Sequence, residues 1–226
     1  MRPITYSALA FAPILAGILV VYLTNRYNRN FGYLLMKSFF AGMLGVIVLI
    51  LTLLIAHSLK LDEVRTLKRT LFYTFFIVGL SSELGKFIVF RYYVIPHSEI
   101  DRPIHAITFS VMTSLGFTSI SMILFFTNFY EMQDLYKTGF YPFLIVPANL
   151  IFAVIMGFFV GMSRFLSVRF FYSIIGLFGA AFFHGLFKFC LVVHDFKLLS
   201  LFAFGSTLIV LVLVIKAAFT KPDILV

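Results

Sequence analysis

Residues 71–94 read LFYTFFIVGLSSELGKFIVFRYYV, an apolar run that carries Glu83 and Lys86 near its middle. A transmembrane helix needs about 20 mostly apolar residues, and this run is long enough. The two opposite charges are three residues apart, so they lie on one face of a helix. A lone charge at membrane depth costs ~2.5–3.5 kcal/mol on insertion scales, and such residues normally face a bundle interior or a wet cavity. The run therefore predicts a membrane helix inside a bundle, with either a functional site or a structural ion pair on its charged face.

The whole chain has the composition of a polytopic membrane protein. Of its 226 residues, 62% are hydrophobic and only 12% are charged, whereas a soluble domain is usually about 45–50% apolar and about 25% charged. The net charge of +9 comes mostly from Lys and Arg in short loops between apolar runs, where these residues meet anionic lipid. We therefore expect the lipid bilayer as a partner, and no nucleic acid. The single cysteine, Cys190, predicts neither an intrachain disulfide nor a cysteine-based metal site.

Hydropathy predicts an all-α, polytopic integral membrane helix bundle with about seven transmembrane helices. The first apolar run lacks a small-residue cleavage site, so we expect a retained helix and not a signal peptide. Lys and Arg divide almost evenly between the two faces, and the positive-inside rule therefore selects no orientation. No soluble domain or linker interrupts the pattern, which indicates a single transmembrane domain over residues 1–226. The predicted spans are residues 5–23, 32–57, 71–95, 104–127, 140–162, 170–193 and 198–215.

Several polar side chains from different predicted helices lie at membrane depth. Hydrolysis of a peptide bond there needs a group that activates water, a group that protonates the leaving amine, and donors for the oxyanion. A glutamate and a histidine at depth meet the first two needs, so Glu83 and His184 are the candidate catalytic residues. The supporting polar residues are Lys86, Ser121, Asn149 and Lys188, with His105 as a marginal member.

Four short motifs contain these residues: Ser82-Glu83-Leu84-Gly85-Lys86, the run from Gly116-Phe117 to Ser121, Pro147-Ala148-Asn149, and His184-Gly185-Leu186-Phe187-Lys188. Their order and spacing resemble the PrsW family of intramembrane peptidases over roughly residues 71–193. That family is related to the CAAX-prenyl-protease and bacteriocin-processing superfamily. The family's patterns are Glu-Glu-x-x-Lys, Gly-Phe-x-x-x-Glu, Pro-x-His and His-Gly-x-x-Asp. This chain departs once in each: Ser82 and Ser121 replace a Glu, Asn149 replaces the His, and Lys188 replaces the Asp.

The resemblance implies a protein of the bacterial inner membrane that cleaves other membrane proteins, such as anti-sigma factors. It implies that Glu and His residues do this, with or without a metal. The departures predict no metal in this chain, because a catalytic zinc usually has three protein ligands and Glu83 and His184 supply only two. Lys188, one turn after His184, would also repel a cation. We expect no other cofactor.

Three functions remain open at this point. The replaced acids favour a family member that has partly or wholly lost proteolytic activity and that binds another membrane protein. The alternative is an active intramembrane peptidase that uses Glu83 and His184. The third is a small transporter or channel, although no repeated pair of broken helices is visible. Purely structural interpretations stand beside these: a buried salt bridge of Glu83 with Lys86 or Lys188, and a neutral core histidine at position 184.

Overall fold

A computed structural model describes residues 3–25, 29–127, 129, 141–166 and 168–220 of the chain. Every regular element in these ranges is helical, which confirms the predicted all-α bundle. The helices are α1 (Pro3–Asn25), α2 (Arg29–Ser58), α3 (Leu67–Phe72), η1 (Tyr73–Leu80), α4 (Ser81–Ile88), η2 (Val89–Val94), α5 (Pro103–Phe126), α7 (Tyr141–Met162), α8 (Arg169–Val193) and α9 (Phe196–Phe219).

Six of the helical segments in the described ranges are long and apolar enough to cross a membrane. They are α2, the continuous segment Leu67–Val94, α5, α7, α8 and α9, and in α1 the stretch Phe11–Thr24 is a shorter apolar helix. Each predicted span therefore corresponds to a helix. The most exposed of the six is α9, whose outward side chains, such as Phe204 and Leu211, are apolar. Such a surface is suited to lipid and confirms a polytopic membrane protein.

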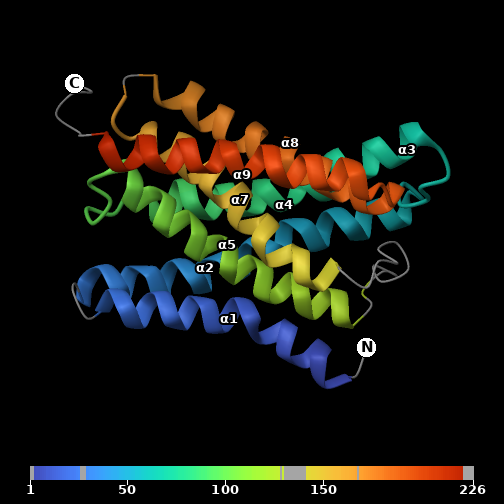
Figure 1. The fold of residues 1–226 in the computed structure, drawn as a ribbon, viewed down its shortest axis with the longest axis horizontal. Helices are drawn as coiled ribbons and strands as arrows, with labels where there is room; N and C mark the ends of the chain where they lie inside the picture. The colour runs from blue at the N-terminus through green and yellow to red at the C-terminus, as the bar shows by residue number, and fades with distance from the viewer. Residues whose placement is uncertain (1–2, 26–28, 128, 130–140, 167, 221–226) are drawn as a thin grey trace.

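The helices lie side by side along the long axis of the molecule (Figure 1). The flanks are formed by α1 and α2 on one side and by α8 and α9 on the other, with α5 and α7 between them (Figure 1). Helix α5 packs against α2 and α7, and α7 packs in turn against α8. The segment from α3 to η2 contacts both α2 and α8. This placement puts α4, with its two charges, in the interior of the bundle.

The segment that carries the charges is an α-helix interrupted by two π-helical stretches. It begins after Thr66, whose hydroxyl oxygen accepts a hydrogen bond from the Arg69 backbone N–H at 3.4 Å, as an N-cap residue does. The π-helical η1 and η2 lie directly before and after α4. Such stretches are rare and occur frequently at functional sites. Six of the eight residues of α4 are buried: Ser81, Ser82, Glu83, Gly85, Lys86 and Phe87.

Glycines bring the backbones of the central helices into direct contact. Gly85 of α4 lies against Gly45 of α2, and Gly116 of α5 lies against Phe39 of α2. A Cβ atom at Gly85 or Gly116 would overlap a backbone carbonyl oxygen of α2. Small residues allow membrane helices to approach this closely, and dispersion contacts between the backbones then stabilise the bundle. The close approach of α2 therefore encloses α4 on one side.

We expect Gly116→Ala to destabilise the bundle, while Gly205→Ala in α9 does not. Both changes raise helix propensity by about 1 kcal/mol, and a Cβ at Gly205 meets no described atom within 4 Å. At Gly116 the added methyl group forces α2 and α5 apart, which typically costs about 1–3 kcal/mol. Thermal unfolding of the two variants in detergent measures the difference. Equal melting temperatures would contradict the close packing of α2 on α5.

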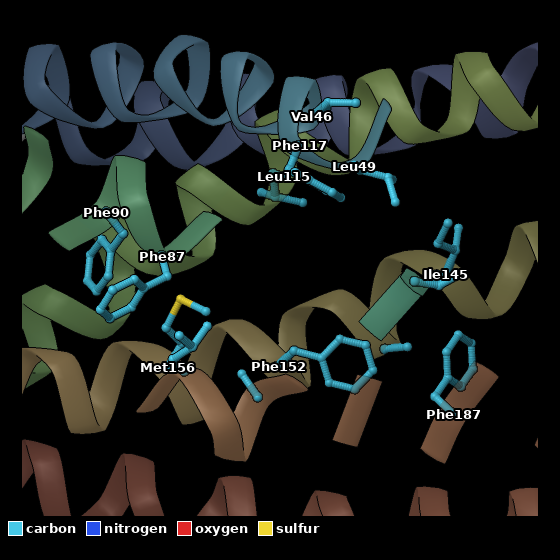
Figure 2. Close-up of a cluster of buried hydrophobic side chains, with 14 of the residues drawn as sticks. Val46, Leu49, Phe87, Phe90, Leu115, Phe117, Ile145, Phe152, Met156 and Phe187 are labelled. Atoms are coloured by element: carbon cyan, nitrogen blue, oxygen red, sulfur yellow. The ribbon is translucent and has the colours of Figure 1, made fainter. Parts of the chain in front are cut away.

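Aromatic side chains fill the space around the charged helix. Phe87, Phe117, Phe152 and Phe187 belong to one buried hydrophobic cluster, part of which is drawn in Figure 2. The ring centroids of Phe152 in α7 and Phe187 in α8 are 6.1 Å apart, so the cluster joins these two helices. Burial of a charge among such groups is costly unless the charge is paired and hydrogen-bonded. Each buried charge near these rings therefore needs a partner of opposite charge or a hydrogen-bonding group.

Candidate functional site

The two charges of α4 form an ion pair along one helix, as their spacing predicts. Lys86 Nζ donates a hydrogen bond to Glu83 Oε1 at 2.5 Å, and both side chains are almost fully buried. The same ammonium donates to Asn149 Oδ1 of α7 at 2.9 Å. Of the two predicted partners for Glu83, Lys86 is the one with which it pairs. The prediction that these side chains face the bundle interior is confirmed.

His184 of α8 reaches the same carboxylate oxygen. Its Nδ1 lies 2.6 Å from Glu83 Oε1, and its ring stacks on Phe152 with centroids 4.7 Å apart and planes at 19°. An ionised carboxylate only accepts hydrogen bonds, so Nδ1 carries the proton and donates it to Glu83. In a neutral ring this leaves Nε2 as the acceptor nitrogen. Residues 101 positions apart in the chain thus meet at one oxygen atom.

Asn149 links the charged pair of α4 to α7, and a side-chain hydroxyl of α5 holds the Asn149 backbone. Its Nδ2 donates to the Ile145 carbonyl at 2.9 Å, and its own backbone carbonyl accepts from Ser114 Oγ of α5 at 3.1 Å. These bonds orient the amide so that Oδ1 is available to the ammonium of Lys86. The position of Asn149 in the site therefore depends on packing between α5 and α7.

Lys188 lies one turn after His184 and has a different partner. Its Nζ donates to the phenol oxygen of Tyr141 at 2.5 Å and lies 4.4 Å from the centroid of that ring. Both side chains are buried. Sequence reasoning missed Tyr141, because a tyrosine at the start of a span is usually a residue of the interfacial aromatic belt. A second buried cation therefore lies on the same face of α8 as His184.

Two of the predicted residues have partners outside this hydrogen-bonded centre. Ser121 is buried in α5, but its hydroxyl donates to the Phe117 carbonyl one turn earlier at 3.1 Å. His105 is 30% exposed at the start of α5 and lies 2.6 Å from Asp101. The structure thus gives Ser121 a bond within its own helix and places His105 near the surface. Neither residue makes a described hydrogen bond to Glu83.

The carboxylate of Glu83 is asymmetrically bonded. Oε1 accepts from both Lys86 and His184. Oε2 is also buried, and no described side chain or backbone group donates a hydrogen bond to it. A buried acceptor without a protein donor is uncommon in native structures and calls for an explanation. Oε2 therefore keeps its lone pairs while its twin is held in place, and a carboxylate oxygen of this kind is suited to accept a proton from water.

The fold and this centre define a class: a polytopic membrane protein with ionisable groups enclosed between its helices. A family described as "PrsW family intramembrane metalloprotease" matches residues 32–219 of the chain. The chain therefore belongs to this family. The predicted family is thereby confirmed, and the match extends on both sides of residues 71–193. No solved structure matched the chain.

Curated relatives agree with the family. Protease PrsW of Bacillus subtilis (strain 168) is 27% identical over 154 residues, 68% of this chain and 66% of the relative. The Oceanobacillus iheyensis protein of the same name is 28% identical over 155 residues, 68% of this chain and 66% of the relative. That of Clostridioides difficile is 28% identical over 160 residues, 70% of this chain and 65% of the relative. The matched part therefore spans slightly under two thirds of these relatives.

The residues present do not fit the metal that the family description implies. In the described part of the chain, no three His, Cys, Asp or Glu side chains are grouped so that they could hold a metal ion. Glu83 Oε1 already binds an ammonium and an imidazole N–H. A catalytic zinc site usually has three such ligands and an open position for water. The donor set here is that of an ion-pair network.

Proposed function

We propose that the chain is an active intramembrane peptidase that hydrolyses a peptide bond of another membrane protein in the cytoplasmic membrane of a bacterium. Membership of the family and the names of the relatives support the reaction class and the bacterial membrane. The observation that carries the proposal is the geometry of Glu83, with Oε1 fixed by two donors and Oε2 buried without a protein donor. A carboxylate used only as a structural anion would be expected to use both oxygens.

The proposed reaction uses Glu83 as both base and acid. Oε2 takes a proton from water, and the resulting hydroxide attacks the carbonyl carbon of the scissile bond. The Lys86 ammonium beside the carboxylate stabilises the negative charge that develops on the carbonyl oxygen, as preorganised donors do in other hydrolases. The protonated Oε2 then gives its proton to the leaving amine as the carbon–nitrogen bond breaks. Water is consumed as OH on the new acid and H on the new amine, and Glu83 returns to its starting state.

His184 is assigned a positioning role in this reaction. Its Nδ1–H holds Oε1, and stacking on Phe152 fixes the ring. A carboxylate held in one orientation presents Oε2 to the reacting water without a search through rotamers. Precise placement of this kind can contribute several kcal/mol to a rate, because the reactants then meet in a near-attack geometry.

Replacement of His184 tests this role through a pair of variants. We expect His184→Ala to lower kcat about 10- to 100-fold with little change in KM, since a hydrogen bond to a charged group is worth about 1.5–3 kcal/mol. His184→Asn places an amide N–H near the position of Nδ1, and we expect it to recover part of that loss. Cleavage kinetics in proteoliposomes measure both. Equal activity of the Ala and Asn variants would contradict the positioning role.

The function itself is tested by co-expression with a panel of epitope-tagged single-span bacterial membrane proteins. We expect the wild-type chain to convert at least one of them to a fragment whose new terminus lies in or beside its span, as mass spectrometry can identify. If no tagged protein were cut but one co-purified with the chain, the chain would be a non-catalytic binding protein. That result would contradict the proposal and restore the interpretation that the replaced acids favoured.

A further inference from the structure

We propose that the buried centre uses the Lys86 ammonium as its resident cation and takes no divalent metal ion. The family description implies a metal, and the ligands of this chain do not form a site for one. The inference concerns what occupies the centre, and it stands whether or not the chain cleaves a peptide bond.

The surroundings of Lys86 have the character of a built cation site. An ammonium has three N–H donors, and two of them bind Glu83 Oε1 at 2.5 Å and Asn149 Oδ1 at 2.9 Å. The faces of two aromatic rings complete the enclosure, with Nζ 5.1 Å from the centroid of Phe117 and 5.8 Å from that of Phe152. Ring faces attract a cation through their quadrupole. Four helices therefore hold one positive charge: α4 carries it, and α5, α7 and α8 surround it or its carboxylate.

A metal ion at this centre would have to share one carboxylate with the ammonium of Lys86. The carboxylate oxygen that faces this centre, Oε1, is already bonded to Lys86 and His184. His184 Nδ1 donates its hydrogen to that oxygen, so this nitrogen has no lone pair for a metal. A divalent ion beside Glu83 would also repel the ammonium across a short distance in a medium of low dielectric constant. The lysine and the metal are therefore alternatives at one carboxylate.

Lys188 brings a second positive charge, which would also repel a metal cation. It replaces the acid of the family's last motif and follows His184 by one helical turn, with its ammonium held at Tyr141 Oη. In a metal site, a carboxylate at this i+4 position would join the histidine as a ligand from the same helix face. Here the same face of α8 presents an imidazole and a cation. The substitution removes a ligand and raises the positive charge of the interior.

The first test is the metal content of the wild-type protein. We expect elemental analysis of protein purified without chelators, and then incubated with zinc or cobalt and desalted, to find far less than one ion per chain. The melting temperature should not change with added zinc or with chelator. About one ion per chain, lost in the His184→Ala variant, would overturn the proposal. This measurement needs no substrate, so its failure is distinguishable from a failure to detect cleavage.

The second test removes the lysine side chain and returns its charge in solution. Lys86→Ala deletes a fragment with the shape of n-propylammonium, and we expect this ion to raise the melting temperature of the variant by about 5–10 °C at 100 times its dissociation constant. Neutral n-propanol and zinc should have no such effect. Lys37→Ala is the matched control, because Lys37 of α2 lies over the ring of Tyr33 with Nζ 4.4 Å from its centroid, away from the carboxylate.

The response of Lys86→Ala to n-propylammonium either supports or contradicts the resident ammonium. If Lys86→Ala folds only when n-propylammonium is present during expression, that dependence supports a resident ammonium as directly as a shift in melting temperature. A variant that n-propylammonium leaves unchanged in both assays, or that zinc stabilises in its place, would overturn the proposal.

Discussion

The double variant Glu83→Gln with Lys86→Met is expected to remain folded and to lose cleavage of the membrane-protein substrate by about 10²–10⁴-fold, the usual contribution of a general acid–base group. Gln and Met have nearly the shapes of Glu and Lys, so the packing of α4 changes little. The variant leaves neither member of the ion pair as an unpaired charge. What it removes is the base Oε2 and the ammonium beside it. Fragment yield over time in proteoliposomes measures the loss.

The matched control for this experiment is Lys37→Met. It removes a lysine of α2 that lies over Tyr33 and does not belong to the proposed catalytic group. We expect it to cleave at the wild-type rate. A double variant that is as active as this control would show that Glu83 and Lys86 are structural only, and that the reaction uses other residues.

The second large effect concerns stability. Lys86→Met alone leaves the Glu83 carboxylate without its ammonium partner, and breaking a buried pair from one side typically costs ~3–5 kcal/mol. Glu83→Gln alone strands the ammonium in the same way. Replacement of both charges with residues of similar shape is often nearly neutral, so we expect the double variant to recover most of the loss. Unfolding of the wild type, both single variants and the double variant in detergent completes the cycle.

The size of the coupling separates two descriptions of the pair. A coupling energy of several kcal/mol indicates that each charge is held chiefly by the other, as the 2.5 Å contact indicates. Single variants whose effects simply add would contradict this. They would show that Asn149 and His184 satisfy the two charges independently, and the ammonium would then not be tied to this carboxylate.

The amino-acid sequence by itself determined the class of protein and the positions of the helices. Every predicted span corresponds to a helix, because the hydrocarbon core requires an apolar run of fixed length whose backbone groups are satisfied within the helix. That requirement is local, so it can be read from composition alone. The inward direction of Glu83 and Lys86 followed from the cost of exposing charge to lipid. Their i, i+3 spacing gave one of the two salt bridges that the sequence left open, with Lys86 or with Lys188, and the structure contains the pair with Lys86.

The sequence was less informative about the chemistry of the centre. Four replaced motif residues favoured a chain that had lost its activity, whereas the function that we propose is that of an active peptidase. Motif comparison scores each position separately. The retained pair Glu83 and His184 is a single hydrogen-bonded unit in the fold, and the replaced Ser121 forms its hydrogen bond within its own helix.

Only the tertiary structure decided which of the polar residues meet. Glu83 and His184 are 101 positions apart, and Lys86 and Asn149 are 63 apart. Contacts of this kind depend on the rotation and depth of each helix against its neighbours. Backbone approach at glycines such as Gly85 sets these quantities, and so do the π-helical stretches on either side of α4. The contact between Tyr141 and Lys188 also joins residues that are distant in the sequence, and it too depends on how the helices pack. Apolar composition determines that a helix lies in the membrane, but it is compatible with many rotations of that helix about its axis. The packing of side chains between helices selects one of these rotations.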